Sequence, residues 1–331
     1  MAWTRNRMAS AVVGAAMAGA TLALASGPAL AVDWIMASGY SEENFLTKNL
    51  RLFIDDVQKT SSVKIALNSN DSLIKLDAIK TAVQRGQVPI GEIRIGVYGN
   101  EDPMNILDGL PFIASTYAEA WLLKDLQKEY FAQKFAKDGM RVLFFGVWPG
   151  QGFYTKTPVA TVADFKGKKL RIYSTATQKM GQMLGFNATI LPFAEVPQAF
   201  STGLIEALFT SPQTGIDIQA WDNTKYFTYA GAILSKNAVI VSERYFAALP
   251  EADKAAILAA AAKAEIRGWE MSAQTTAAQI QTLGKNGMTT ANAPAEIITE
   301  LKKIGLVMMD DWRKTASPEA VAVLDRYLAV Q

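Results

Sequence analysis

The chain has 331 residues, contains neither cysteine nor histidine, and carries 33 basic against 31 acidic side chains. The two missing residue types exclude disulfide bonds, thiolate nucleophiles, imidazole general bases and the usual zinc sites. The near-neutral charge argues against a surface that binds nucleic acid or membrane, and the length is enough for two domains with cores of their own.

The first 31 residues have the pattern of a signal peptide. Arg5 and Arg7 supply the basic end, a run of small and apolar residues follows, and Ala29-Leu30-Ala31 is a small-x-small cleavage site. The run is too short for a good membrane anchor, and no later stretch approaches the length of a membrane span. We therefore expect a periplasmic protein, cleaved after Ala31 and not embedded in the membrane.

Strands and helices then alternate. Residues 33–37 and 63–67 are typical of strands, and apolar residues at helical spacing predict a helix over 45–57. A second helix is expected from Leu73 to Gly86. This alternation predicts a largely parallel α/β sheet, whose ligand loops lie at the carboxyl ends of its strands. The loops 38–44 and 69–72 are therefore candidate ligand loops, or ordinary solvated turns.

Two further strands follow. The alternating run Gly91–Ile95 places Glu92 and Arg94 beside each other, either near a ligand or facing solvent from an edge strand. Residues 142–147 are continuously apolar, which is typical of a strand buried on both faces. The next segment, 148–154, combines glycine, proline and aromatic residues and suits a crossover between two domains.

A strand–helix unit then presents an arginine. Alternation puts Leu170 and Ile172 on one face of the strand and Arg171 and Tyr173 on the other. Ser174 or Thr175 can cap the next helix, which Gly185 should end. An arginine beside a helix N-terminus can hold a carboxylate with its planar fork. The alternative for Arg171 is a surface or interdomain ion pair.

The rest of the chain is mainly helical. A short helix is expected near 192–203, and strand 239–241 should return the chain to the first domain. Residues 251–283 predict one unusually long helix, or two helices divided at Gly268. Pro318 opens a final helix.

A spaced motif in residues 164–214 resembles the signature of the DctP family, the solute-binding proteins of TRAP transporters. It reads G-x-K-x-R and, after a helix and an apolar turn, E-V-x-x-A-x-x-x-G. The matching residues are Gly167, Lys169, Arg171, Glu195, Val196, Ala199 and Gly203.

The resemblance implies a fold and its domains. We expect a periplasmic-binding-protein-like α/β fold, with two α/β lobes around a central ligand cleft, crossover strands and a long bracing helix. Lobe I would comprise residues 32–148 plus 237–275, and lobe II residues 149–236 plus 276–331.

The resemblance also implies a binding site. In the family the motif arginine binds the substrate carboxylate and an aromatic residue packs on the substrate, which here correspond to Arg171 and Phe193. Two positions depart from the family pattern: Gln151 stands where several members have arginine, and Thr210 or Ser211 where many have asparagine. The candidate substrate-binding residues are Arg171, Phe193, Thr210, Ser211, Gln151, Tyr173, Trp148, Glu92 and Arg94.

The substrate class follows from charge and aromatic content. Without a cation at Gln151, a second carboxylate has lost its natural partner. Aromatic residues fall in or beside the expected cleft loops, although core packing is the expected role of most: Trp34, Trp148, Phe153, Tyr173, Phe193 and Phe209. We therefore expect a ring-bearing monocarboxylate such as an aromatic or sugar acid.

The resulting hypothesis is a solute-binding protein that captures an organic acid and delivers it to a TRAP membrane permease, with no catalysis, cofactor, metal or nucleic acid. One alternative keeps the fold but binds a C4-dicarboxylate or a 2-oxo acid. Another keeps the fold but serves an ABC-type permease or a sensor. A distant alternative is an exported hydrolase or lyase that uses two carboxylates, for which Glu92 and Glu195 are the candidates.

Overall fold

A computed structural model of the chain describes residues 32–330, so the predicted signal peptide and its cleavage site lie outside the described residues. The strands of this part are β1 Val32–Ala37, β2 Val63–Asn68, β3 Ile90–Arg94, β4 Met140–Val147, β5 Gly152–Thr155, β6 Lys169–Ile172, β7 Asn187–Ile190, β8 Ala207–Thr210, β9 Tyr226–Tyr229, β10 Lys236–Ser242 and β11 Thr289–Asn292. The helices are α1 Phe45–Thr60, α2 Ile79–Gln84, α3 Tyr117–Lys137, α4 Thr175–Met183, α5 Val196–Ser201, α6 Pro212–Asp217, α7 Glu243–Ala247, α8 Glu251–Lys285, α9 Ala295–Thr315 and α10 Pro318–Leu328.

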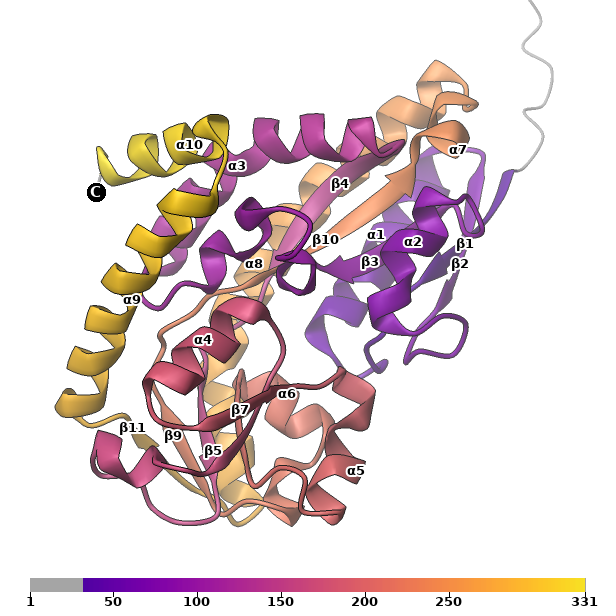
Figure 1. The fold of residues 1–331 in the computed structure, drawn as a ribbon. Helices are drawn as coiled ribbons and strands as arrows, with labels where there is room; N and C mark the ends of the chain where they lie inside the picture. Colours follow the sequence, from indigo (N-terminus) through magenta and orange to yellow (C-terminus); the bar gives the residue numbers. More distant parts are fainter. Residues whose placement is uncertain (1–31, 331) are drawn as a thin grey trace, which may run out of the picture. The chain divides into compact units, whose positions relative to one another are not determined.

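The strands form two mixed sheets (Figure 1). The five-stranded first sheet has the order β2-β1-β3-β10-β4, and the six-stranded second sheet has the order β11-β9-β5-β8-β6-β7. In the first sheet β1 pairs in parallel with β2 and β3, while β10 runs antiparallel to β3 and β4. The chain passes to the second sheet after β4 and returns before β10.

The two crossover segments lie side by side and bond to each other. The N–H of Trp148 donates to the carbonyl of Ser235 at 2.8 Å, and the N–H of Gly231 donates to the carbonyl of Gln151 at 2.8 Å. These bonds make a paired connection between the sheets, as the crossover prediction required. Gln151 and Ser235 thereby come together although they are far apart in the sequence.

One long helix contacts both sheets. α8 packs against α1 and β4 beside the first sheet and against α6 and β11 beside the second. It is continuous over Glu251–Lys285, so the alternative of two helices divided at Gly268 is wrong. Gly268 is instead a close-packing position, because a Cβ there would lie 2.6 Å from the Asn49 side-chain nitrogen. The expected two α/β parts, crossover strands and bracing helix are confirmed.

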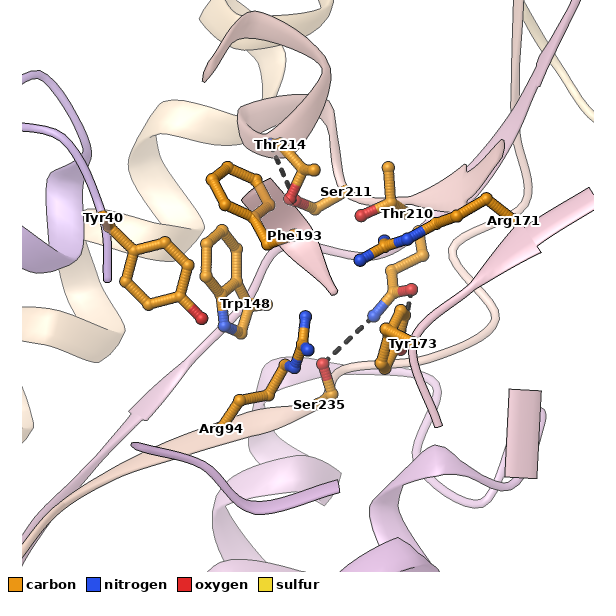
Figure 2. A pocket seen from close by; sticks show the side chains of 11 residues that line it. Tyr40, Arg94, Trp148, Arg171, Tyr173, Phe193, Thr210, Ser211, Thr214 and Ser235 are labelled. Carbon is orange, nitrogen blue, oxygen red and sulfur yellow. Dashed lines mark hydrogen bonds between the residues drawn. The ribbon is translucent and has the colours of Figure 1, made fainter. Parts of the chain in front are cut away.

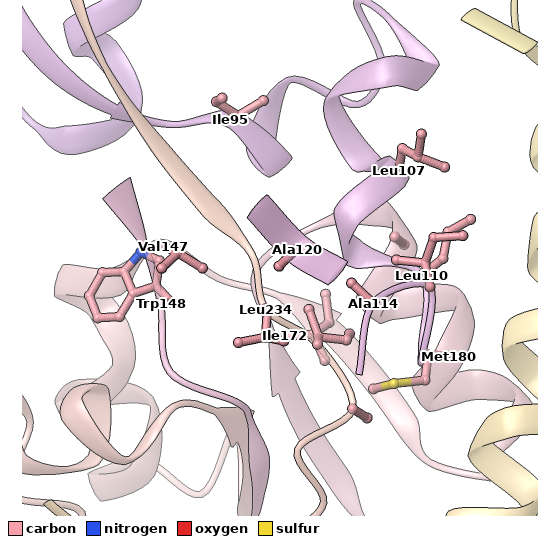
Figure 3. Packing of buried hydrophobic residues seen from close by; sticks show 14 of the residues in the cluster. Ile95, Leu107, Leu110, Ala114, Ala120, Val147, Trp148, Ile172, Met180 and Leu234 are labelled. Atoms are coloured by element: carbon pink, nitrogen blue, oxygen red, sulfur yellow. The ribbon is translucent and has the colours of Figure 1, made fainter. Parts of the chain in front are cut away.

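A shared apolar core lies beneath the strand ends (Figure 3). It joins Val147 at the end of β4 to Ile172 of β6 and Met180 of α4. Leu170 and Ile172 are both fully buried in it, which confirms the apolar face predicted for β6. Arg171 lies on the opposite face of β6, and Tyr173 follows on the same side just beyond the strand.

The position of β3 differs from the edge-strand alternative. β3 lies between β1 and β10, and all five of its residues are buried. Strand order caused the difference, because β10 comes from far along the chain to cover the side of β3 that local sequence leaves open. Glu92 and Arg94 are therefore both buried, and the alternative in which they face solvent is wrong.

The helix expected from Leu73 is shorter than predicted. A 3-10 turn spans Leu76–Ala78, α2 begins at Ile79, and Leu73 itself is exposed. Asn70 and Asp71 have positive φ angles, and the Asp71 side chain accepts a hydrogen bond from the N–H of Leu76. The preceding loop therefore ends in a side-chain cap, and the helical backbone starts only after it.

Within residues 32–330, no helix is both long and apolar enough to cross a membrane.

Candidate functional site

Strand ends from both sheets surround one cavity (Figure 2). The first sheet contributes the residues that follow or end β1, β3 and β4, and the second contributes the ends of β6 and β8. The eleven lining residues are Tyr40, Arg94, Trp148, Gln151, Arg171, Tyr173, Phe193, Thr210, Ser211, Thr214 and Ser235. Eight of them were candidates from sequence, and Tyr40, Thr214 and Ser235 are additions.

Arg171 is held in place by its own lobe of the structure. It lies in β6, between β7 and β8, and is 1% exposed. Its Nε and Nη2 atoms donate to the carbonyl of Leu191 at 3.1 and 2.9 Å, which fixes the plane of the guanidinium. A guanidinium has five N–H donors, so the remaining ones can face the cavity. Figure 2 shows the group pointing into it.

A helix begins directly beyond Arg171. Ser174, one of the two caps that the sequence allowed, caps α4 and accepts a hydrogen bond from the N–H of Thr177. Gly185 has a φ of +88° just after the helix, a conformation that glycine adopts at little cost. The strand end, cap and helix start thus form one rigid unit that aims Arg171.

A second guanidinium faces the same cavity. Arg94 ends β3, is 7% exposed, and forms a long ion pair with Asp77 at 3.4 Å. Burial and the nearby charge of Arg94 lower the pKa of Arg171 to about 9. No carboxylate of residues 32–330 forms an ion pair with Arg171. Two buried cations that repel each other make this cavity a favourable place for an anion.

Arg94 also changes the charge argument made from the sequence. Gln151 indeed supplies no cation, but Arg94 places one in the cavity from the other sheet. The inference from Gln151 therefore missed this second cation, which already forms an ion pair with Asp77. That inference considered only the position of Gln151. The end of β3 comes close to β6 only in the folded structure, and local sequence does not predict this approach.

Aromatic rings form one wall. Tyr40 meets Trp148 edge-on with ring centroids 5.1 Å apart, and meets Phe193 in the same way at 5.8 Å. The indole N–H of Trp148 donates to Asn237 at 2.9 Å, and Asn237 donates to Glu92 at 3.0 Å. These contacts leave flat apolar surface toward the cavity, which suits the face of a small ring.

Three other candidate aromatics are in the core. Trp34 packs in β1 among apolar side chains of the first sheet, and Phe153 and Phe209 pack on each other with centroids 4.8 Å apart. Core packing was the expected role of most of the aromatic candidates, and for these three it is confirmed. Trp148, Tyr173 and Phe193 are the members of that set that reach the cavity.

A hydrogen-bonded chain holds Gln151. The hydroxyl of Tyr173 donates to Gln151 Oε1 at 2.8 Å, and Gln151 Nε2 donates to Ser235 at 3.1 Å. Burial raises the pKa of Tyr173 to about 12, so the phenol stays a proton donor. Gln151 thus lines the cavity with its amide oriented by Tyr173, which follows β6, and by Ser235 of the second crossover segment.

Short side chains with hydroxyl groups line the side of the cavity that is next to α6. Thr210 ends β8, and Ser211 caps α6 by accepting from the N–H of Thr214 at 3.1 Å. The motif resemblance aligned one of these two residues, Thr210 or Ser211, with an asparagine of the family pattern. The structure places both at the cavity, where they offer neutral hydroxyl groups.

Glu92 is the one candidate that the cavity does not include. It is 2% exposed and accepts hydrogen bonds from Ser38 at 2.7 Å and from Asn237 at 3.0 Å. Burial raises its pKa. Because Asn237 also binds the indole of Trp148, Glu92 lies behind the aromatic wall and supports it, and we no longer assign it to the ligand.

The carboxylate pair required for the hydrolase alternative is not assembled. Glu195 lies at an exposed hollow with Asp71 and Asp77, whereas Glu92 is buried behind Trp148. None of the eleven cavity residues is a carboxylate. Nor do residues 32–330 contain a group of three acidic side chains placed to hold a metal ion. The site can bind and orient an anion, but it offers no acid–base pair.

The sequence holds a different amount of evidence for each of the three cavity residues that were not predicted from it. Tyr40 falls in the loop 38–44 that the strand pattern marked as a candidate ligand loop, so its position carried a signal. Ser235 precedes β10 and Thr214 lies in the first turn of α6. Nothing local distinguishes these two from other surface hydroxyl residues, because the sheet topology alone brings them here.

Comparison with known proteins identifies the family. Residues 36–315 match the DctP family model, described as bacterial extracellular solute-binding protein, family 7. A solute-binding protein of Albidiferax ferrireducens is 24% identical over 212 residues, so the match spans 63% of this chain and 63% of that relative's length.

Two solved structures share the fold. DctP7 of Bordetella pertussis, an extracytoplasmic solute receptor binding pyroglutamic acid, is 41% identical with a TM-score of 0.87 and is covered over 99% of its length by 90% of this chain. A TRAP solute-binding protein from a marine metagenome, in complex with co-purified pyroglutamate, is 31% identical with a TM-score of 0.87, over 91% of this chain and 99% of that one. The chain described here therefore belongs to the DctP family of bacterial extracellular solute-binding proteins.

Proposed function

We propose that this protein is the extracytoplasmic receptor of a TRAP transporter and that it binds a ring-bearing monocarboxylate, with pyroglutamate as the first candidate. The observation that carries the proposal is the pair of buried guanidinium groups, Arg94 and Arg171, that face a cavity without any carboxylate in its lining. Such a cavity is completed electrostatically by an anionic ligand.

The charges around the cavity favour one carboxylate. Arg94 is partly neutralised by Asp77, whereas Arg171 has no such partner among residues 32–330. The net excess is close to one positive charge, which one carboxylate balances. A C4-dicarboxylate would add a second negative charge without a second free cation, so it and the 2-oxo acids are the runner-up ligands.

The shape of the wall favours a ring. Tyr40, Trp148 and Phe193 present aromatic surface to the cavity, and the hydroxyl and amide groups opposite can bind a neutral polar group. Pyroglutamate combines a five-membered ring, one carboxylate and a neutral lactam. The two solved relatives that bind it, 41% and 31% identical to this chain, support it as the candidate.

A thermal-shift panel tests the ligand. L-pyroglutamate at 100 times its dissociation constant should stabilise the fold by about 2.7 kcal/mol and raise the melting temperature by roughly 5 °C or more. The panel also includes succinate and malate, 2-oxoglutarate, benzoate and glucuronate. A shift confined to the dicarboxylates or 2-oxo acids would replace the ligand assignment by its runner-up, and no shift with any acid would contradict the proposal.

Delivery requires release as well as binding. We assign the lobes as predicted, with residues 32–148 and 237–275 in lobe I and residues 149–236 and 276–331 in lobe II, and we propose that the ligand closes them like a hinge. The partner would be the TRAP permease, which the family supports over an ABC-type permease or a sensor. Export with cleavage after Ala31 belongs to the same proposal.

One contact between the proposed lobes can be tested directly. Asn44 caps α1 and donates from Nδ2 to Asp217 of α6 at 2.8 Å, and Gln213 donates to the other oxygen of Asp217 at 2.7 Å. Burial raises the pKa of Asp217 to about 6, so near neutral pH this carboxylate is ionised and accepts both bonds. A contact of this kind should stabilise the closed form.

Asn44→Ser keeps a capping oxygen for α1 but removes the donor to Asp217. We expect a ligand affinity about fivefold weaker, because a lost hydrogen bond to a charged group destabilises only the closed form. Isothermal titration measures the affinity, and the conservative cap change Thr116→Ser in α3 is the control. An unchanged dissociation constant in Asn44→Ser would show that the contact does not help closure.

A further inference from the structure

Tyr40 is a polar residue of the cavity wall whose hydroxyl has no hydrogen-bond partner among the described residues. The side chain is 1% exposed and lines the cavity, and its hydroxyl makes no hydrogen bond of normal geometry within residues 32–330, although the Asn237 side chain lies near it. Tyr173, the other tyrosine that lines the cavity, donates to Gln151. Buried polar groups are nearly always hydrogen-bonded, so a free phenol in a cavity wall is available to a ligand.

The geometry of Tyr40 is fixed before any ligand arrives. Its ring is held edge-on against Trp148 and Phe193, at 5.1 and 5.8 Å between centroids (Figure 2). Burial raises the pKa of Tyr40 well above its usual value, which keeps the hydroxyl protonated. Tyr40 therefore presents an oriented O–H donor.

Arg94 lies on the same sheet as Tyr40. Tyr40 follows β1, Arg94 ends β3, and the two strands are paired. The Nε atom of Arg94 is also buried and has no hydrogen-bond partner in the described part of the chain. This side of the cavity thus offers donors from a phenol and from a guanidinium that Asp77 already partly neutralises. Arg171, on the second sheet, forms no ion pair with an acidic side chain of residues 32–330.

We propose that Tyr40 is a specificity-determining residue whose O–H, together with Arg94, binds an uncharged carbonyl oxygen of the ligand while Arg171 binds its carboxylate. This inference rests on the proposed function and deepens it. The site then distinguishes ring acids by the presence of a carbonyl group on the ring. The lactam of pyroglutamate has that carbonyl two bonds from the carbon that bears the carboxylate.

Three acids of one ring size separate this contact from the others. L-pyroglutamate has the lactam, 3-oxocyclopentanecarboxylate keeps the carbonyl without the lactam N–H, and cyclopentanecarboxylate has neither. Isothermal titration of the wild-type protein, Tyr40→Phe and Tyr98→Phe gives nine dissociation constants. Tyr98 is the matched control, because its hydroxyl is buried without a hydrogen-bond partner among residues 32–330, as that of Tyr40 is, but it does not line the cavity.

The wild type should bind both carbonyl acids about tenfold more tightly than cyclopentanecarboxylate. Tyr40→Phe should remove about that factor for the carbonyl acids and change the affinity for cyclopentanecarboxylate by less than about threefold. Tyr98→Phe should change none of the three. The melting temperature of each ligand-free variant reports whether the fold is intact.

The contrary results are distinct. If Tyr40→Phe weakens all three acids equally, or weakens none, the carbonyl contact is wrong while the proposed function stands. A wild-type protein that binds the three acids equally well overturns the contact in the same way. If the wild type binds none of them, the proposed ligand class fails, and this inference fails with it.

Discussion

Replacing Arg171 by methionine should abolish most ligand binding and leave the fold intact. Charge-assisted hydrogen bonds contribute roughly 1.5–3 kcal/mol each, and a guanidinium can make two to one carboxylate. We therefore expect the dissociation constant for the bound acid to rise about a hundredfold, which corresponds to about 2.7 kcal/mol. Isothermal titration at constant salt measures it.

The stability of the ligand-free variant gives a second, independent readout. Arg171 is buried near Arg94, and burial together with that charge lowers its pKa, so its charged form is disfavoured in the free protein. Losing the charge should offset the lost hydrogen bonds to Leu191, and the melting temperature should change by only a few degrees.

Two comparison variants make the Arg171 result specific. Arg171→Lys keeps a cation without the planar fork and should bind with intermediate affinity. Arg141→Met removes an arginine that pairs with Glu243 outside the cavity and should bind like wild type. If Arg171→Met binds the ligand as tightly as wild type, the carboxylate is held elsewhere and the arginine clamp is wrong.

Phe153→Ala should strongly destabilise the fold. Its ring lies 4.6 Å from Phe165, 4.8 Å from Phe209 and 5.9 Å from Phe186, measured between centroids, and all four side chains are buried. Truncating a buried phenylalanine typically costs 3–5 kcal/mol, since the surrounding side chains close the hole only in part. We expect the melting temperature to fall by roughly 10 °C.

Phe193→Ala is the matched variant at the cavity. Phe193 is only partly buried, so its loss should change the melting temperature by about 2 °C or less, while ligand affinity should fall about tenfold because the aromatic wall is opened. Phe153→Ala, measured well below its melting temperature, should bind within about threefold of wild type. The assignment of core and wall would be reversed if Phe193→Ala destabilised the fold and Phe153→Ala weakened binding.

Much of the local structure could be predicted from residue patterns. Apolar spacing located α1, an alanine-rich stretch without proline located α8, and alternation placed Arg171 and Tyr173 opposite Leu170 and Ile172. Ser174 or Thr175 marked the start of α4. These are properties of one strand or one helix. Side-chain periodicity and capping depend on neighbours a few positions away, and such neighbours are visible in the sequence.

The pairing of distant elements could not be predicted in this way. β10 lies between β3 and β4, so β3 is an interior strand of the sheet and its residues Glu92 and Arg94 are buried. In this arrangement Arg94 lines the cavity, whereas Glu92 lies behind Trp148. Alternation places these two residues, two positions apart, on the same face of β3. Their different roles therefore come from the partners that other elements bring to each: Ser38 and Asn237 to Glu92, and Asp77 to Arg94.

Aromatic residues illustrate the same limit. Phe153 and Trp148 both fall in the segment 148–154 and both belong to the buried core, yet only Trp148 also lines the cavity. Their local sequence contexts are alike, and only the position of the second sheet separates them. The resemblance to a known motif located Arg171 and Phe193 at the cavity, whereas for Tyr40 the sequence marked only its loop, 38–44, and the structure placed its side chain.

A crystal structure of the complex with L-pyroglutamate tests the central claim most directly. The account predicts the ligand in the cavity between the two sheets, with its carboxylate oxygens about 2.7–2.9 Å from the guanidinium nitrogens of Arg171. Its lactam carbonyl should point toward Tyr40 and Arg94. A ligand whose carboxylate lies away from Arg171, or that binds outside this cavity, would contradict the account.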